Sequence, residues 1–304
     1  MLESIRAHYW IGQRRRLLYD SIRLRPHQTV VDVGCGTGAF TRVLAEGLDE
    51  ERSGRIVGVD RNPQLLKVAR RISREEDYGM RFMVFKEGDA KAIPLHDDFA
   101  DRVVCQALLW LMTDSDRVKA LKEMIRVCKI GGLVAAVEGA VDSSITYFPN
   151  DGRLTDLFRK RHLAELKGYK IVHGSDRAIG YKLPAIFKQL GLTKVRLDGV
   201  AHVELQSDDR FPLDYRLGEH RRLSRYPRQL LLKLDRISTE EGKKHFIEKM
   251  EPSLMAGGLS WEEIAELAKL RASYHSRLAK NPDSIREESS VQAGIGFITT
   301  GVKN

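Results

Sequence analysis

The feature that most constrains the fold is a short apolar run that is followed by a glycine-rich turn. The run spans residues 30–33, and three glycines follow at every second position, Gly34, Gly36 and Gly38. Apolar runs of this length are typical of buried parallel strands. Glycines let the main chain turn tightly and approach a ligand closely. Residues 39–48 then place four apolar side chains on one helical face. The segment therefore predicts a strand, a turn and a helix, which together bind nucleotide-like ligands at the carboxyl end of a parallel strand.

Asp32 helps to distinguish between the ligands that such a turn receives. In the dinucleotide pattern, which Gly34, Gly36 and Ala39 also satisfy, the turn and the helix N-terminus receive a pyrophosphate. A carboxylate two residues before the first glycine would repel that anion, and it suits a ligand with a positive amino group. The pattern Asp32-x-Gly34-x-Gly36-x-Gly38 resembles the first motif of class I S-adenosylmethionine (SAM)-dependent methyltransferases.

Two further acidic positions extend this resemblance. Asp60 ends the second predicted strand, where a carboxylate accepts both hydroxyls of a ribose, and Arg61 follows it. The segment Gly88-Asp89-Ala90 follows the third strand and resembles the adenine-binding segment of the family. This resemblance implies that the Asp89 carboxylate accepts from the exocyclic amino group and that the Ala90 backbone meets a ring nitrogen. Asp60 is common to NAD and SAM proteins, whereas a dehydrogenase does not require Asp89 and Ala90.

The resemblance implies SAM as the cofactor and S-adenosylhomocysteine as its product. Gln106 follows the fourth strand, where the family brings residues against the methyl donor. Members that methylate base amino groups carry Asn/Asp-Pro-Pro-Tyr there, whereas this chain has Gln106-Ala107-Leu108-Leu109, which disfavours that reaction. The predicted cofactor-binding residues are Asp32, Gly34, Cys35, Gly36, Gly38, Asp60, Arg61, Asp89, Ala90 and Gln106.

No catalytic dyad stands out in the sequence. Methyl transfer depends largely on holding the nucleophile, the methyl carbon and the leaving sulfur in line, so a general base is optional. The candidates for such a base are Glu138, at the end of the fifth strand, and Tyr147, His173 and Tyr181. Each has an ordinary structural role as its alternative.

Strands and helices alternate regularly over residues 28–140. Strands are predicted at 30–33, 55–60, 81–85, around 103–105 and at 133–137, and a helix over 116–128 is expected to end at Gly131-Gly132. Such alternation predicts a parallel sheet with right-handed crossovers. Residues 195–203 and 291–302 add two strands. The predicted fold is therefore α/β, a doubly wound, seven-stranded and mostly parallel sheet whose last strand is antiparallel, as in the methyltransferases, with a helical insertion cover.

The chain divides into a predicted core and an inserted helical cover. The boundaries are 1–27 for an N-terminal helical segment, 28–140 for the SAM-binding core, 141–178 for an insertion that is part of the cover, 179–204 for completion of the core, 205–290 for the helical cover and 291–304 for the final core strand. Both cover segments leave the core just after predicted strands. We therefore expect them to close over the ligand-binding edge and to define the acceptor pocket.

The charge of the chain leaves the class of acceptor open. The formal net charge is +9, and arginines are dense between Arg216 and Arg236. Such an excess permits an anionic partner, so an RNA or protein methyltransferase is the alternative to the favoured small-molecule enzyme. An NAD-dependent dehydrogenase and a non-enzymatic SAM-binding protein are further alternatives. A tight basic patch would favour RNA, and a closed apolar pocket would favour a small acceptor.

Composition also restricts the cellular compartment and the kinds of metal or disulfide site that we expect. The three cysteines, Cys35, Cys105 and Cys128, are far apart and form no Cys-x-x-Cys pair, which argues against a metal site and against a disulfide framework. No apolar run approaches the ~20 residues of a membrane span, and residues 1–16 are charged without a signal-peptide core. These features predict a cytoplasmic protein without a membrane partner, and they leave its oligomeric state open.

Overall fold

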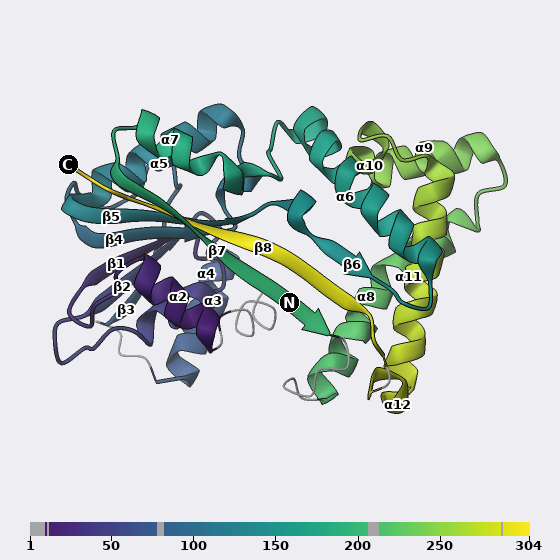
Figure 1. The fold of residues 1–304 in the computed structure, drawn as a ribbon, viewed down its shortest axis with the longest axis horizontal. Helices are drawn as coiled ribbons and strands as arrows, with labels where there is room; N and C mark the ends of the chain where they lie inside the picture. The colour runs from purple at the N-terminus through teal and green to yellow at the C-terminus, as the bar shows by residue number, and fades with distance from the viewer. Residues whose placement is uncertain (1–9, 11, 78–81, 206–212, 287) are drawn as a thin grey trace. The chain divides into compact units, whose positions relative to one another are not determined.

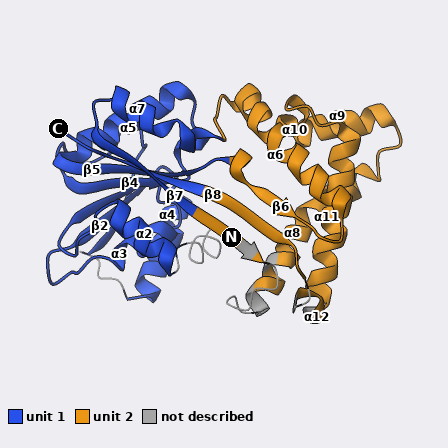
Figure 2. Ribbon diagram, viewed as in Figure 1, with its two compact units in different colours: residues 1–140, 178–200, 296–304 blue, residues 141–177, 201–295 orange. Residues whose placement is uncertain are grey.

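The computed structural model describes residue 10 and residues 12–77, 82–205, 213–286 and 288–304. The chain forms two compact units, which Figure 2 colours separately. Unit 1 contains residues 1–140, 178–200 and 296–304, and unit 2 contains residues 141–177 and 201–295.

An eight-stranded sheet has its main body in unit 1 (Figure 1). The strands are β1 (Thr29–Val33), β2 (Arg55–Asp60), β3 (Met83–Glu87), β4 (Ala100–Gln106), β5 (Cys128–Gly139), β6 (Ile145–Tyr147), β7 (Thr193–Leu205) and β8 (Val291–Val302). Their order is β3-β2-β1-β4-β5-β8-β6, and β7 also pairs with β8. Strands β1 to β5 are parallel, and β8 is antiparallel to β5 and β6.

The order of the strands identifies where a ligand should bind. The chain runs outward from β1 to β3 on one side and from β4 to β5 on the other, so the direction reverses between β1 and β4. In open α/β sheets, ligands bind outside the carboxyl ends of the strands at such a reversal.

Helices cover both faces of the sheet in unit 1. They are α2 (Gln13–Ser21), α3 (Ala39–Ala45), α4 (Pro63–Glu75), α5 (Asp114–Val127) and α7 (Leu183–Gln189), with short 3₁₀ helices η1 (Leu109–Leu111) and η3 (Ile179–Tyr181). Val30 and Ile56 pack with α2, α3 and α4 on one face, whereas Val31 and Val57 pack with α5 and α7 on the other. Because both faces are covered, all five β1 side chains are buried.

Unit 2 is mainly helical. Its helices are α6 (Gly152–His173), α8 (Leu213–Leu234), α9 (Glu240–Met250), α10 (Pro252–Ala256), α11 (Trp261–Lys280) and α12 (Pro282–Arg286), with the 3₁₀ helix η2 (Val141–Ser143). Helix α6 touches the α10 region through its backbone, because a Cβ on Gly168 would lie 1.5 Å from the carbonyl oxygen of Ser253. None of the described helices is both long and apolar enough to cross a membrane.

Several element boundaries follow from local sequence signals. Asn62 caps α4 by accepting from two backbone amides, with Pro63 in the first turn. Ser260 and Glu263 form a reciprocal capping box at the start of α11. The final strand, β8, has the predicted bounds of 291–302. These signals depend on neighbouring residues, so sequence alone is sufficient to find them.

The fold class is confirmed, with two differences in detail. The sheet has one strand more than the predicted seven, because the three-residue β6 pairs with β8. The pair Gly131-Gly132, predicted to end a helix, lies inside β5, and helix α5 already ends at Val127. The reason is a distant contact, since Lys303 exchanges backbone hydrogen bonds with these two glycines and so draws them into the sheet.

Candidate functional site

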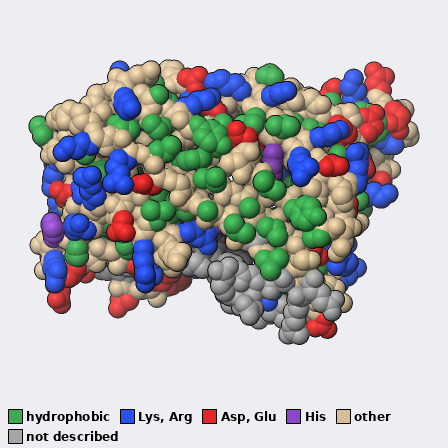
Figure 3. Space-filling model, in the orientation of Figure 1, with side chains coloured by type: hydrophobic (Ala, Val, Ile, Leu, Met, Phe, Trp, Pro, Cys, Tyr) green, Lys and Arg blue, Asp and Glu red, His purple; other side chains and the backbone are tan. Residues whose placement is uncertain are grey.

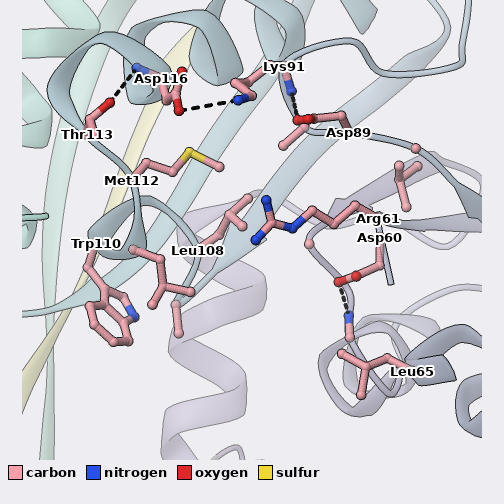
Figure 4. Close-up of a pocket in the computed structure, with 17 residues that line it drawn as sticks. Asp60, Arg61, Leu65, Asp89, Lys91, Leu108, Trp110, Met112, Thr113 and Asp116 are labelled. Atoms are coloured by element: carbon pink, nitrogen blue, oxygen red, sulfur yellow. Dashed lines mark hydrogen bonds and ion pairs between the residues drawn. The ribbon is translucent and has the colours of Figure 1, made fainter. Parts of the chain in front are cut away.

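A cavity of about 440 Å³ lies at the carboxyl ends of the central strands of unit 1 (Figure 4). Its walls come from four stretches of chain, namely the glycine turn after β1, the end of β2, the segment after β3 and the loop between β4 and α5. The lining residues are Gly34, Gly36, Val59, Asp60, Arg61, Leu65, Gly88, Asp89, Ala90, Lys91, Ala107, Leu108, Trp110, Leu111, Met112, Thr113 and Asp116. The cavity therefore occupies the place that the strand order indicates.

The glycine turn requires glycine for two separate reasons. Gly34, Gly36 and Gly38 all have positive φ angles, of 74°, 56° and 80°, which other residues adopt only with strain. A Cβ would also lie 2.8 Å from Leu108 at Gly34 and 2.9 Å from Phe85 at Gly38. The turn therefore has no room for side chains at Gly34 and Gly38, and its backbone at Gly34 and Gly36 lines the cavity.

Asp60 ties the glycine turn to the end of β2. Its Oδ2 accepts from the Gly36 amide at 2.8 Å, and its Oδ1 accepts from the Asn62 amide at 2.8 Å. Each carboxylate oxygen has a further lone pair that remains suited to a hydroxyl donor. The neighbouring Arg61 is exposed, and Figure 4 shows its side chain extending across the cavity toward Leu108.

The wall beside Asp60 is held by Asp89 and two charged neighbours. The Asp89 Oδ1 accepts from the Lys91 amide at 2.8 Å, which folds the segment into a tight turn. The Lys91 Nζ pairs with Asp116 at 3.3 Å, and the Asp116 amide donates to the Thr113 hydroxyl at 3.2 Å (Figure 4). This chain of contacts joins the segment after β3 to the start of α5.

Two buried charged side chains fix the apolar wall formed by Leu108, Trp110 and Met112. The Oε1 of Glu138 accepts from the Leu108 and Leu109 amides at 2.9 and 2.6 Å. The guanidinium of Arg117 donates to the Leu109 and Met112 carbonyls at 3.1 and 2.8 Å and pairs with Asp114. Burial raises the pKa of Glu138 to about 7. Both side chains therefore act on the backbone of the wall.

The cavity brings together six of the residues that the sequence predicts for the cofactor, Gly34, Gly36, Asp60, Arg61, Asp89 and Ala90. The other four, Asp32, Cys35, Gly38 and Gln106, do not line it. Asp32 is 1% exposed and accepts from the Thr41 hydroxyl at 2.6 Å. Cys35 is buried, and Gln106 is half-buried. A direct contact between these four residues and a ligand stays a prediction.

The residues predicted as catalytic candidates are not gathered at the cavity. Glu138 is buried behind the apolar wall. Tyr181 belongs to unit 1 and packs on Phe297, with ring centroids 4.9 Å apart. Tyr147 and His173 belong to unit 2, in β6 and at the end of α6. The catalytic roles of all four stay predictions.

Sequence reasoning missed Lys91, Thr113, Asp116 and Arg117. Thr113 and Asp116 do carry a local signal, because Thr-x-x-Asp is a helix-start pattern and Thr113 does cap α5. Lys91 and Arg117 carry no such signal, since their partners become neighbours only when the chain folds.

Comparisons with known proteins agree with this site. A family profile described as "Methyltransferase domain" matches residues 30–132. The chain is 28% identical over 195 residues to the demethylmenaquinone methyltransferase of Desulfitobacterium hafniense (strain Y51), covering 62% of this chain and 74% of the relative. It is 30% identical over 195 residues to the enzyme of the same name from Bacillus cereus (strain ATCC 10987 / NRS 248), covering 60% and 78%.

Two solved structures share the fold over most of the chain. The YcgJ protein from Bacillus subtilis has a TM-score of 0.51 at 17% identity and covers 95% of this chain and 97% of its own. A putative methyltransferase from Bacillus halodurans C-125 has a TM-score of 0.52 at 15% identity and covers 96% and 99%.

This site combines a glycine turn with acidic residues at the ends of neighbouring strands. Together with the sequence similarity, it defines a methyl-transferring enzyme. The chain belongs to the class I SAM-dependent methyltransferases. It is a transferase that uses SAM, which separates it from the dehydrogenases that share the turn.

Proposed function

We propose that the unit 1 cavity binds SAM and that its methyl group passes to a small organic acceptor. One observation carries the proposal: the glycine turn, Asp60 and the Asp89-Ala90 segment line a single cavity. Gly34 and Gly36 would face the methionine half of the donor, and Asp60 would accept from the ribose hydroxyls. Asp89 and the Ala90 backbone would meet the adenine.

SAM supplies an activated methyl group, and this chain supplies orientation and shelter from water. Leu108, Trp110 and Met112 form an apolar wall, which is suited to the flat adenine ring and excludes water from a positive sulfonium. Asp60 and the turn amides hold their positions through hydrogen bonds within the protein itself. A preorganised site of this kind favours in-line transfer mainly by restricting the reactants' motion.

For the acceptor we propose a small aromatic molecule of the quinol type. The support is the similarity to two demethylmenaquinone methyltransferases at 28% and 30% identity, over 62% and 60% of this chain. In such a ring, a carbon beside a hydroxyl attacks the methyl group, the sulfur leaves with its electron pair, and the ring carbon then loses a proton.

An RNA acceptor is the second candidate, and one surface feature favours it. Four arginines of α8, Arg221, Arg222, Arg225 and Arg228, line an open groove in unit 2. On the face seen in Figure 3, however, Lys and Arg side chains are interspersed with Asp and Glu. A mixed surface of this kind favours the small acceptor on that face.

Methyl transfer from labelled SAM to each acceptor class decides between these candidates. We expect label in a demethylated quinol and none in RNA, with S-adenosylhomocysteine formed in equal amount. An Arg225→Gln, Arg228→Gln double variant is the control, and it should keep the activity on the quinol. Transfer to RNA that the double variant loses would contradict the small-molecule proposal.

We also propose that residues 141–178 and 205–290 form the cover that defines the acceptor pocket. The support is that residue 141 follows closely after β5, whose carboxyl end lies beside that of β4, at the edge where open α/β sheets bind ligands. Hydrogen–deuterium exchange with S-adenosylhomocysteine and acceptor bound together should show protection in both segments. Protection restricted to unit 1 would overturn the cover.

A further inference from the structure

Unit 2 contains a cavity of its own, which the methyl-transfer site does not use. It measures about 180 Å³ and lies among β6, α6, α8, α11 and the start of β8. The described residues that line it all belong to unit 2. Side chains of Phe158, Arg161, His162, Arg271, Tyr274 and His275 carry its chemistry.

Two guanidinium groups flank one aromatic ring in this cavity. The Arg271 guanidinium carbon lies 5.6 Å from the centroid of Phe158, and that of Arg161 lies 5.9 Å from it. Stacking on a ring stabilises each cation modestly, but it does not neutralise the charge. The two guanidiniums also repel one another.

The carboxylates near this cavity are engaged with groups other than Arg271. Glu165 is buried and pairs with both Arg161, at 2.8 Å, and Arg177, at 3.1 Å. Glu251 accepts a hydrogen bond from Tyr226 at 2.7 Å, and the buried Glu288 pairs with Arg277 at 2.9 Å. Arg271 itself forms no ion pair with any residue that the structure describes.

Arg271 also has unused hydrogen-bonding capacity. Its Nε is buried and has no hydrogen-bond partner in the described part of the chain. Burial, together with repulsion from Arg161, lowers the pKa of Arg271 to about 10, so the group still carries its charge at neutral pH. A half-buried cation whose Nε is fully buried is costly unless an anion accompanies it.

The two histidines at the cavity do not add to this charge. The His162 Nδ1 lies 3.0 Å from the Ser144 carbonyl, and burial lowers the pKa of His162. The His275 Nδ1 lies 3.0 Å from the His220 Nδ1, and burial lowers the pKa of His275 to about 2. Both rings are therefore neutral near pH 7, and the positive charge of the cavity comes from Arg161 and Arg271.

We propose that this cavity is a binding site for a small planar carboxylate, which Arg271 and Arg161 hold by its charge and Phe158 and Tyr274 by its flat body. The planar fork of a guanidinium matches a carboxylate in two parallel hydrogen bonds. A monoanion suits Arg271, the one of these two guanidiniums that has no ion pair among the described residues, and the aromatic lining favours an organic acid over the strongly hydrated inorganic phosphate. The site stands independently of the proposed function, because no residue of the donor cavity takes part in it.

Calorimetric titration with three probes in a chloride-free buffer tests the site. Benzoate is the planar carboxylate, benzamide is its neutral isostere, and inorganic phosphate is the competing anion. We expect benzoate to bind at least about tenfold more tightly than either of the other two, since a charge-assisted pair contributes this much. Equal binding of benzamide, tighter binding of phosphate, or no detectable binding of benzoate would overturn the proposal.

Three variants assign the binding to Arg271. Arg271→Gln should weaken benzoate binding about tenfold or more, and Arg271→Lys, which keeps the charge without the fork, should weaken it less. Lys269→Gln removes a charge from an exposed position of the same helix, and it should leave the affinity within about twofold. Benzoate should also raise the melting temperature of the wild type but not that of Arg271→Gln. An unchanged affinity in Arg271→Gln would overturn the assignment.

Discussion

The two units differ in what their buried or half-buried charged side chains contact. In unit 1, the Oε1 of Glu138 and the guanidinium of Arg117 bind backbone amides and carbonyls of the loop that forms the apolar wall, and only the Oε2 of Glu138 has no partner among the described residues. In unit 2, the half-buried Arg271 retains a buried nitrogen without a partner among the described residues. A charge bound to backbone holds a site in shape, whereas a charge without a partner is available to a ligand. A cavity wall held by internal hydrogen bonds and a cation without an ion pair are therefore separate signs of function.

The largest effect is expected where unit 2 packs most tightly. In Gly168→Ala, the new Cβ would lie 1.5 Å from the Ser253 carbonyl oxygen, so α6 and α10 must separate. We expect a loss of about 3 kcal/mol or more in the free energy of unfolding, as measured by chemical denaturation.

Gly218→Ala is the matched control for this variant. Gly218 is a glycine inside helix α8, and a Cβ there meets nothing within 4 Å. The change should stabilise the protein by up to ~1 kcal/mol, because alanine favours a helix. While Gly168→Ala remains folded, its affinity for SAM should stay within about twofold of the wild type, since the donor cavity lies within unit 1. A loss of SAM binding in the folded variant would show that the donor cavity of unit 1 depends on the packing of unit 2.

Glu138 should make the stability of the protein depend on pH. Its pKa rises from 4.5 to about 7 on folding, so between these values the folded state holds a proton that the unfolded state has lost. The free energy of unfolding therefore falls by about 3 kcal/mol as the pH rises through this window. Above it, the contribution of Glu138 no longer changes with pH. Unfolding measured from pH 4 to pH 8, roughly the range around both values, should show this fall.

The variant Glu138→Gln distinguishes the titration of Glu138 from that of the other titratable groups in the protein. The variant keeps an acceptor for the Leu108 and Leu109 amides but does not titrate, so its fall over the same window should be smaller by that amount. Glu87→Gln, an exposed carboxylate at the end of β3, controls for the loss of one acidic group. Parallel profiles for the wild type and Glu138→Gln would show that Glu138 does not control this pH dependence.

A smaller effect is expected at Asp60. Asp60→Ala removes the acceptor for the Gly36 and Asn62 amides and for the ribose hydroxyls that we assign to it. We expect SAM binding to weaken about tenfold to a hundredfold, with Asp60→Asn losing less because it keeps one oxygen acceptor. Benzoate binding in unit 2 should not change in either variant, which sharpens the separation of the two sites. An unchanged affinity for SAM in Asp60→Ala would remove Asp60 from the site.

Much of the donor site could be predicted from short local motifs. Gly34 and Gly36 follow an apolar strand, and Asp60 and Asp89 each end a strand or follow one, so short motifs are sufficient to find them. The carboxyl ends of neighbouring parallel strands meet at one edge of the sheet, which brings these motifs together.

The remaining features depend on contacts that no local pattern reveals. Gly131 and Gly132 were predicted to end a helix, yet Lys303, near the far end of the chain, pairs with them. Arg117 and Glu138 hold the apolar wall through backbone groups of a loop that has no sequence signature. The cavity around Arg271 is lined by residues from five elements. That Arg271 has no ion pair among the described residues can therefore be seen only in the folded structure.

Binding of a SAM-type ligand in the unit 1 cavity can be measured by calorimetric titration of the wild-type protein with SAM, S-adenosylhomocysteine and NAD. We expect one site for SAM and for S-adenosylhomocysteine, weakened in Asp60→Ala, and no measurable binding of NAD. Tight binding of NAD without any binding of SAM would contradict this expectation.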